Sequence, residues 1–404
     1  MAGKFVKMFS GLGLNILNSN ANQLPGGGAP SVNNDFVIEV DTTQAGSASD
    51  TIILPLLSGG TYSGTIDWGD SSSDDLTYAN RQHTYAAGGT YTITISGDTF
   101  EGWRVANSGD RQKFIDISNW GFFTITTDNA FNGCSNLDIT ATDAPIITTS
   151  SFAFIFNECD ALTTPDFSNW DTSTVTNMRD ALARCNSFNG NVANWVHSGV
   201  TSLFRMLISS TSFNQDLDSW DVSGVTSWYE FMRGASAFNG SMAGWTVQGS
   251  FNELAFGLMP AFTGIGLDSW DTSGMISFRS AFGSDLVFNP DVSGWDISNT
   301  TSIESAFSNC DSFDQNLSNW DITSLSSATN FMQSATGLST ANYDATLIGW
   351  EATLQAAFPS GSGYTPTINI HFGGSTYTLG GAAEAARTSL ISTFGWTITD
   401  GGGV

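Results

Sequence analysis

The chain has 404 residues, and its 38 acidic residues against 12 basic ones give a formal net charge of −26. This charge argues against polyanionic partners, because nucleic-acid binding depends on lysine and arginine neutralising phosphates, and it also disfavours docking on anionic lipid. Only 12% of the residues are charged and 40% are hydrophobic, so the composition is not that of a disordered acidic tail. We expect a large folded chain with no nucleic-acid partner and no membrane insertion.

Residues 1–33 differ in charge from the remainder, because they contain two lysines and no acid. They end in PGGGAP (25–30), which is typical of a flexible linker. The apolar stretch is broken by Gly11 and Gly13 and the chain retains Met1, so we expect an anchor that docks into a partner rather than a signal peptide. A disordered tail is the alternative. The expected anchor residues are Lys4, Phe5, Lys7, Phe9 and Leu12.

Residues 34–99 form the next predicted domain, in which the alternation of apolar and polar residues predicts strands at 35–40, 51–56, 64–70 and 89–97. The sequences IDWGDSSS and HTYAAGGTYTITISG resemble polycystic-kidney-disease (PKD) modules. That resemblance implies an immunoglobulin-like β-sandwich that acts as a spacer or a weak interaction module. The residues that match are Asp67, Trp68, Gly69, Asp70, His83, Thr84, Tyr85, Gly89 and Tyr91.

Acidic residues cluster in this domain at Asp67, Asp70 and Asp74. Carboxylates are ligands that calcium prefers, although their spacing fits no EF-hand loop, so a calcium ion there is a possible cofactor. We expect His83 to be a partly buried, hydrogen-bonded side chain rather than a metal ligand.

A short basic cluster follows, formed by Arg104, Arg111 and Lys113. We expect it to be a solvated capping face on which these side chains pair with nearby acids.

Tryptophan then recurs every 25 residues, which is the strongest pattern in the sequence. Projecting the period backwards reaches Pro145 and Trp120, so nine units span 120–344. We expect the indole rings to form an internal stack, because one unit cannot bury its own apolar face and stacked units can. The regularly spaced residues are Trp170, Trp195, Trp220, Trp245, Trp270, Trp295 and Trp320.

Each unit divides into two halves. The half before the tryptophan, such as 212–219, suits a short strand, and the segment 175–185 (VTNMRDALARC) has apolar residues at helical spacing. A strand and a helical turn per unit of this length is the leucine-rich-repeat geometry, so we predict an α/β repeat solenoid over 100–344. Cys134, Cys159 and Cys185 share one position of the unit, which predicts small buried side chains and no disulfide framework.

The units resemble the BspA-like leucine-rich-repeat surface proteins, specifically a subgroup with repeats of the form F-N-x-x-L-S-x-W-D-x-S-x-V-T. Pro145, Val196-His197 and Thr246-Val247-Gln248 depart from that form. Residues 345–404 are predicted to be an α/β cap, because a helical pattern at 338–358, a strand at 365–372 and a second helix at 380–396 break the 25-residue period.

The charges of the repeat are sorted by position. All five of its arginines fall in the predicted helical half, while acids and amides fill the strand and turn halves. The aspartates that follow each tryptophan are expected to be turn residues. The strand face is the expected binding surface, and its polar chemistry suits sugars or divalent cations. The candidate ligand-binding residues are Asp166, Asn191, Asn214, Asp216, Asp218, Asn239, Asn289, Asp291 and Asn316.

No catalytic signature occurs, and the histidines lie in three separate regions. We therefore expect a non-enzymatic structural or adhesive protein. The first hypothesis is a bacteriophage virion component (a fibre, spike or decoration protein) displayed on the virion surface. It would be held by other virion proteins through 1–33 and would bind a host-surface polysaccharide or protein. The alternative is an exported BspA-like adhesin on a bacterial cell surface, and either could form a homo-oligomer.

Overall fold

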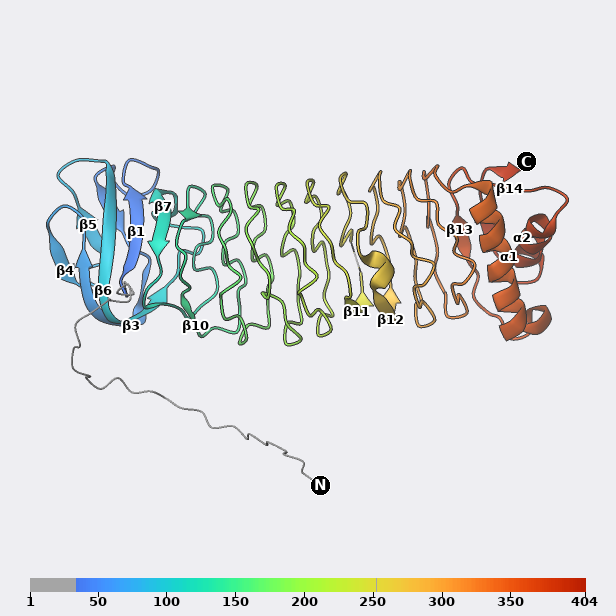
Figure 1. Cartoon of the computed structure of the whole chain (residues 1–404), viewed down its shortest axis with the longest axis horizontal. Helices are drawn as coiled ribbons and strands as arrows, with labels where there is room; N and C mark the ends of the chain where they lie inside the picture. Colours follow the sequence, from blue (N-terminus) through green and yellow to red (C-terminus); the bar gives the residue numbers. More distant parts are fainter. Residues whose placement is uncertain (1–33, 252) are drawn as a thin grey trace, which may run out of the picture. The chain divides into compact units, whose positions relative to one another are not determined.

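The computed structural model describes residues 34–251 and 253–404 (Figure 1). The predicted anchor residues Lys4, Phe5, Lys7, Phe9 and Leu12 lie outside the described residues. The described chain begins with β-strands, continues through a long series of coils and closes with a segment that contains two α-helices and short strands (Figure 1).

A mixed eight-stranded sheet forms the first part of the described chain. β1 (Phe36–Asp41) pairs antiparallel with β6 (Thr90–Trp103) on one side and with β7 (Phe114–Asn119) on the other. Alternate residues of β1 are fully buried, as its sequence pattern predicts. The other strands of the sheet are β3 (Leu56–Asp67), β4 (Ser73–Asp75), β8 (Phe123–Ile125), β9 (Asp138–Ile139) and β10 (Ile146–Ile147). β2 (Thr51–Ile53) and β5 (Gln82–Thr84) form a separate antiparallel pair.

The strands predicted for 34–99 overlap β1, β2, β3 and β6, but the predicted β-sandwich needs correction. The long strands belong to one mixed sheet that also includes β7, β8, β9 and β10. The reason is the length of β6, whose 14 residues pair with β1 in their first part, with β3 from Thr94 to Trp103 and with β8 at Phe100 and Glu101. The sheet therefore runs without a break into the first repeats.

The basic cluster was predicted to be exposed to solvent and paired with acids, and only some of its residues are. Arg104 pairs with Asp128 at 3.2 Å, as expected. Lys113, at the end of the short helix η1 (Arg111–Lys113), is instead fully buried and donates to the carbonyl of Thr51 at 2.7 Å. The solvated-face prediction is therefore wrong for Lys113, because backbone carbonyls of 47–51 satisfy its ammonium group.

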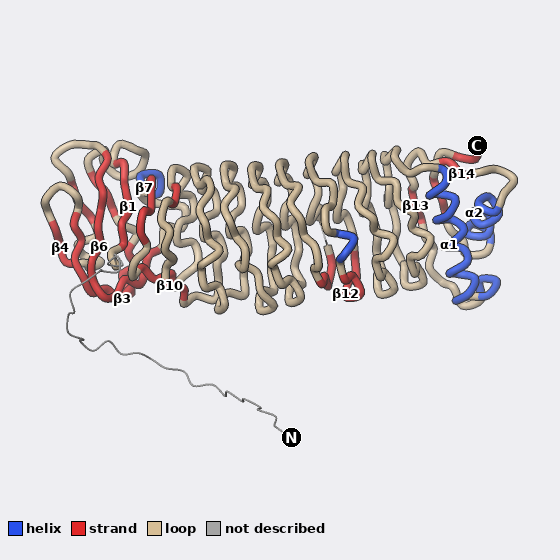
Figure 2. Tube along the Cα trace, viewed as in Figure 1, coloured by secondary structure: helices blue, strands red, loops and turns tan. Residues whose placement is uncertain are grey.

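Between residues 150 and 335 the chain forms successive coils of about 25 residues that lie side by side (Figure 1). The backbone N–H of Asp180, for example, donates to the carbonyl of Phe204 in the next coil at 2.9 Å. Most of this region is loop and turn (Figure 2). The regular strands among its described residues are the parallel pair β11 (Thr246–Ser250) and β12 (Asp271–Ser277).

The α/β leucine-rich-repeat solenoid predicted for 100–344 is wrong. The described residues between 100 and 339 contain no α-helix, and their helical segments are η1 and the 3₁₀ turn η2 (Leu267–Ser269). Small sheets, isolated parallel bridges and turns make up the repeats. In the part of the chain that the structure describes, both α-helices follow the repeats.

Paired turns explain why the sequence looked helical. Each coil turns at two left-handed residues four positions apart, such as Asp180 (φ 50°) and Arg184 (φ 58°). In the first turn the N–H of Ala181 donates to the carbonyl of Met178 across Asp180, as in a type II turn. Two such turns direct an apolar residue into the core about every fourth position, and this spacing is close to that of a helix.

Stacked tryptophans form the core of the coils, as predicted. Trp220, Trp245 and Trp270 are buried. Their successive ring centroids lie 6.2 and 5.7 Å apart, with interplanar angles of 4° and 9°. Among the regularly spaced tryptophans from Trp195 to Trp320, each indole N–H donates to the backbone carbonyl 28 residues earlier. The tryptophans therefore fix the coils by hydrogen bonds as well as by apolar contact.

The stack is interrupted where Pro145 replaces a tryptophan. The carbonyl of Thr142, 28 residues before Trp170, accepts instead from Nδ2 of Asn169 at 3.3 Å. As a result, Trp170 Nε1 has no partner among the described residues. The Trp170 ring packs edge-on against Trp120, with centroids 5.4 Å apart.

The four cysteines are free and buried, as expected. Cys310 donates through Sγ to the carbonyl of Phe282 at 3.0 Å, and Ser210 at the same position of another coil donates to Leu182 at 2.6 Å. The position therefore suits a small side chain that donates a hydrogen bond. Asp285 brings a carboxyl group to this buried position, one coil before Cys310.

The helices predicted at 338–358 and 380–396 are confirmed as α1 (Thr340–Ala357) and α2 (Ala382–Ser392). Trp350 of α1 continues the indole hydrogen bonds by donating to the carbonyl of Leu317 at 2.8 Å. The remaining elements are η3 (Pro359–Gly361), β13 (Asn369–His371), β14 (Thr376–Tyr377), β15 (Thr397–Thr399) and β16 (Gly402–Gly403), with β13 parallel to β15 and β14 parallel to β16.

Candidate binding surfaces

The predicted strand face forms one edge of the coils, and we call it the ladder edge. It consists of residues 138–142, 163–169, 189–193, 214–218, 239–243, 263–269, 289–293 and 314–318, and it contains no lysine or arginine. It lacks regular strands apart from β9, yet it does gather all nine candidate ligand-binding residues. The structure thus places these candidates on one acid-rich edge.

Amide side chains connect neighbouring coils along the ladder edge. Oδ1 of Asn214 accepts from the backbone N–H of Asn239 at 2.7 Å, and Oδ1 of Asn239 accepts from that of Thr263 at 2.9 Å. Asn289 accepts from Asp314 in the same way at 2.9 Å. These amide oxygens therefore complete backbone hydrogen bonding between neighbouring coils.

The remaining candidates also accept backbone hydrogen bonds. Asp216 and Asp218 accept from the backbone N–H groups of Ser241 and Ala243 in the next coil, at 2.8 and 2.6 Å. The others accept through Oδ1 from the residue two positions later in their own coil, and they are Asp166, Asn191, Asp291 and Asn316. Each candidate thus has a structural role, whatever it binds.

Replacing Asn239 by alanine is expected to lower the free energy of unfolding by about 1–2 kcal/mol, because Thr263 loses the acceptor of both its N–H and its hydroxyl group. Urea denaturation of the two proteins would measure the loss. Asn239→Asp is the control, since Asp138 accepts from the N–H and hydroxyl of Thr163 in the same arrangement. A loss in Asn239→Asp as large as in Asn239→Ala would contradict this explanation.

The aspartates that follow the tryptophans accept from the N–H two residues later, as predicted for turn residues, although Asp271 itself begins strand β12. Oδ1 of Asp221 accepts from the N–H of Ser223 at 3.1 Å. After Trp195 the aspartate position is held by Val196, and the next residue, His197, makes a similar bond, because its Nδ1 accepts from the N–H of Gly199 at 3.1 Å. In Asp296, hydrogen bonds from Ser298 hold the pKa of the carboxyl group below its ordinary value.

A groove of about 380 Å³ opens on the ladder edge beside the coil that carries Pro145. Thr142 and Thr164 line it and are exposed, and no hydrogen bond from either hydroxyl group occurs among the described residues. Sequence reasoning identified Asp166 here but missed the two threonines. The signal that could have found them is the interruption of the tryptophan period at Pro145. Other lining residues include Asp138, Thr140 and Thr163.

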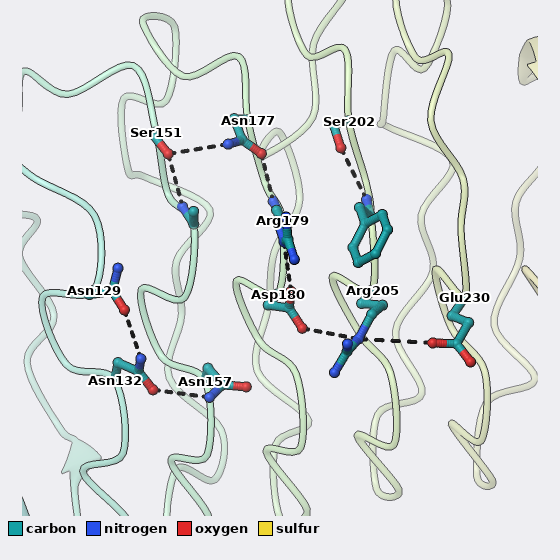
Figure 3. A network of polar contacts seen from close by, with 12 residues as sticks. Asn129, Asn132, Ser151, Asn157, Asn177, Arg179, Asp180, Ser202, Arg205 and Glu230 are labelled. Carbon is teal, nitrogen blue, oxygen red and sulfur yellow. Dashed lines mark hydrogen bonds and ion pairs between the residues drawn. The ribbon is translucent and has the colours of Figure 1, made fainter. Parts of the chain in front are cut away.

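A second edge of the coils holds the left-handed turns, such as the segment from Asp180 to Arg184, and we call it the turn edge. It carries the arginines of the repeat, among them Arg179 and Arg205 (Figure 3). Asp180 is buried there, with Oδ1 3.2 Å from Nε of Arg205 and Oδ2 3.3 Å from Nε of Arg179. Burial raises the pKa of Asp180, while the two guanidinium groups oppose that effect. Glu230 extends the network 3.9 Å from Arg205, so these charges mainly neutralise one another.

Aromatic side chains on the turn edge also contact one another. Phe204 and Tyr229 stack with ring centroids 4.8 Å apart, and the guanidinium of Arg179 lies 4.6 Å from the Phe204 centroid. The ring faces are therefore covered by neighbouring coils, and we assign these residues to packing.

The aspartates considered for calcium are bonded within their own hairpin. Oδ1 of Asp67 accepts from the N–H of Gly69, and Oδ2 of Asp74 accepts from the indole of Trp68 at 2.9 Å. Asp70 lies 2.9 Å from Nε2 of His83, which is partly buried as expected. Hydrogen bonds from Ser72 and then His83 lower the pKa of Asp70 to about 2. The part of the chain that the structure describes contains no group of three or more His, Cys, Asp or Glu side chains able to hold a metal ion.

Among the comparisons with known proteins, one match covers the repeats, and it describes no role for them. Residues 150–256 and 253–346 match the model of a family described as Mycoplasma protein of unknown function, DUF285. No curated protein and no solved structure matches the chain. The matches include no PKD module and single out no BspA-like subgroup. Among the described residues, no helix has the length and apolarity needed to cross a membrane.

Proposed function

We propose that this protein is a non-enzymatic, surface-displayed binding protein that contacts a hydroxyl-rich polysaccharide through its ladder edge. The observation that carries the proposal is the groove on that edge, which is lined by carboxylates, threonine hydroxyl groups and no basic side chain. Such a site accepts hydrogen bonds from sugar hydroxyl groups and donates to their oxygens. The absence of a basic group on this edge disfavours phosphate-rich ligands.

The structural hydrogen bonds of the edge support this role. Oδ1 of Asp216 is held by a backbone N–H of the next coil, and so the orientation of the carboxylate is fixed before a ligand arrives. Sites that are already ordered lose less entropy on binding. Regularly spaced coils would present similar groups to successive sugars of a polymer, as other repeat proteins present extended surfaces.

Two kinds of surface are candidates for displaying this protein, a phage virion and a bacterial cell. The charge of residues 1–33 supports a virion component held by other virion proteins, and the similarity of the repeats to a bacterial family supports a bacterial surface adhesin. Labelling of purified phage particles and of intact cells with an antibody to the repeats distinguishes them.

Filling the groove tests the function. Thr142→Arg and Thr164→Arg each place a long side chain in the groove, and we expect at least a tenfold loss of binding to the polysaccharides that the unaltered chain binds on an array of bacterial surface polysaccharides. Thr301→Arg is the control, because Thr301 is exposed on a coil outside the groove.

Melting temperatures of the three variants should agree with that of the unaltered chain. If the groove variants bind as well as Thr301→Arg, or if the unaltered chain binds no polysaccharide, the proposed function fails.

A further inference from the structure

Two arginines of the turn edge stand out because they have no acidic partner. Arg233 lies 2.7 Å from Glu230, and Arg205 pairs with Asp180. Arg111 and Arg184, by contrast, have no carboxylate oxygen within 4.0 Å among the described residues. In a chain with 38 acidic residues, two neighbouring guanidinium groups without an acidic partner call for an explanation. Within the described part of the chain Arg81 has no acidic partner either, but it lies over the ring of Tyr78.

Both arginines line one pocket of about 260 Å³. The pocket crosses the first coils at the start of the repeats, and its lining includes Arg111, Arg184, Ser135, Glu158, Asp160 and Asn186. None of these belongs to the groove on the ladder edge.

The turn geometry builds this pocket. Gly133, Glu158 and Arg184 are the second left-handed residues of three successive coils, with φ values of 80°, 61° and 58°. At Gly133 an added Cβ would lie 2.8 Å from Cδ of Arg111. The glycine therefore leaves the space in which the side chain of Arg111 lies, and no L residue would fit there without displacing it.

Neutral groups position the two guanidinium groups without cancelling their charge. Nη1 of Arg184 donates to Oδ1 of Asn157 at 3.4 Å. Asn157 is itself buried and donates to Oδ1 of Asn132 at 3.0 Å (Figure 3). Nη1 of Arg111 donates to the backbone carbonyl of Asn107 at 3.3 Å. The positive charge of both side chains is thus available to an incoming anion.

The acidic residues of the pocket restrict which anion fits. Glu158 is held by a single long hydrogen bond of 3.4 Å from Asn107, and Asp160 accepts from Asn186 at 2.7 Å. Two arginines and two acids leave the pocket without net charge, so recognition there depends on where the charged and polar groups lie rather than on net charge. It suits a ligand with one carboxylate and several neighbouring hydroxyl groups.

We propose that this pocket binds a hexuronate unit of an acidic saccharide, with the carboxylate between Arg111 and Arg184. Arginine donates paired hydrogen bonds that match the geometry of a carboxylate. Glu158 and Asp160 accept from the sugar hydroxyl groups, and Ser135 and Asn186 hydrogen-bond the remaining oxygens. The choice of a saccharide rests on the proposed function, whereas the site itself rests on different residues.

Calorimetric titration with trigalacturonate tests this site, and its methyl ester is the matched ligand without charge. We expect the acid to bind at least tenfold more tightly than the ester. Arg184→Gln and Arg111→Gln should each weaken trigalacturonate binding at least tenfold, and Glu158→Gln should strengthen it because a competing negative charge is removed. Arg279→Gln is the control, since Arg279 lies outside the pocket and 3.8 Å from Glu304.

Equal binding of acid and ester, no binding of trigalacturonate at millimolar concentration, or an unchanged affinity in Arg184→Gln with an unchanged melting temperature would each overturn the inference. The groove variant Thr164→Arg separates the two proposals. If it loses array binding but still binds trigalacturonate, the pocket stands on its own. If Arg184→Gln no longer binds trigalacturonate but still binds the polysaccharide array, the groove on the ladder edge is an independent site.

Discussion

Replacing Trp245 by alanine is expected to lower the free energy of unfolding by about 3–5 kcal/mol. Trp245 is 1% exposed and stacks between Trp220 and Trp270, with centroids 6.2 and 5.7 Å away. Its removal leaves a cavity in the stack and also frees the carbonyl of Leu217, which accepts from the indole N–H at 3.0 Å. Because every coil contacts the next one, two interfaces lose packing at once.

Urea denaturation followed by far-ultraviolet circular dichroism measures this loss. Trp245→Phe is the control, because it keeps an aromatic ring in the stack and removes the N–H, so an intermediate loss is expected. A loss under about 1 kcal/mol for Trp245→Ala would show that the indole stack does not hold the coils together.

Replacing Asp285 by serine is expected to raise the free energy of unfolding at pH 7 by about 1–3 kcal/mol. Asp285 is fully buried, its Oδ1 accepts from the N–H of Met259 at 2.7 Å, and its Oδ2 has no partner among the described residues. Serine fits the site, because Ser210 occupies the equivalent position and donates to the carbonyl of Leu182 at 2.6 Å.

The increase in the free energy of unfolding caused by Asp285→Ser should depend on pH. Burial raises the pKa of Asp285 well above its ordinary value. Below the pKa of the unfolded chain, both states hold the proton and the carboxyl group contributes no pH dependence. As the pH rises above about 4, the unfolded state releases the proton first, so the free energy of unfolding falls until the folded pKa is reached. The advantage of Asp285→Ser should therefore be small near pH 4 and large at pH 7.

Urea denaturation of both proteins at pH 4 and pH 7 checks this expectation. The exposed turn aspartates whose pKa is lowered lose stability as the pH falls, but they are common to both proteins and cancel in the difference. Asp285→Asn is the matched control, since it keeps an acceptor for Met259 and has no charge. A difference that does not change with pH would mean that Asp285 is not buried in its neutral form.

The sequence was sufficient to predict the buried tryptophan stack and the closing helices, because both depend on apolar spacing alone. It was not sufficient to predict the path of the chain between tryptophans. Left-handed turns are usually recognised by glycine, yet here Asp180, Arg205 and even Phe154 adopt positive φ values. Hydrogen bonds to neighbouring coils hold these residues, and such contacts cannot be read from a single repeat.

For the candidate site, the sequence predicts the location of the residues but not their role. The period of 25 residues places Asn214, Asn239 and Asp216 on one edge, and the structure agrees. The same period arises whether an amide faces a ligand or bonds the next coil, so the sequence cannot separate the two roles. Arg184 was assigned to a helical half, and the pocket that it shares with Arg111 depends on turns that the sequence did not reveal.

The indole hydrogen bonds reach only from one coil to the next, and so do the amide bonds of Asn214 and Asn239. A duplication or deletion of one 25-residue unit would therefore leave every remaining coil with the neighbours that it needs. Each such event would change the length of the stack by one parallel-strand spacing, about 4.8 Å. Evolution can thus adjust how far a binding site stands from the start of the repeats in fixed steps, independently of the chemistry of that site.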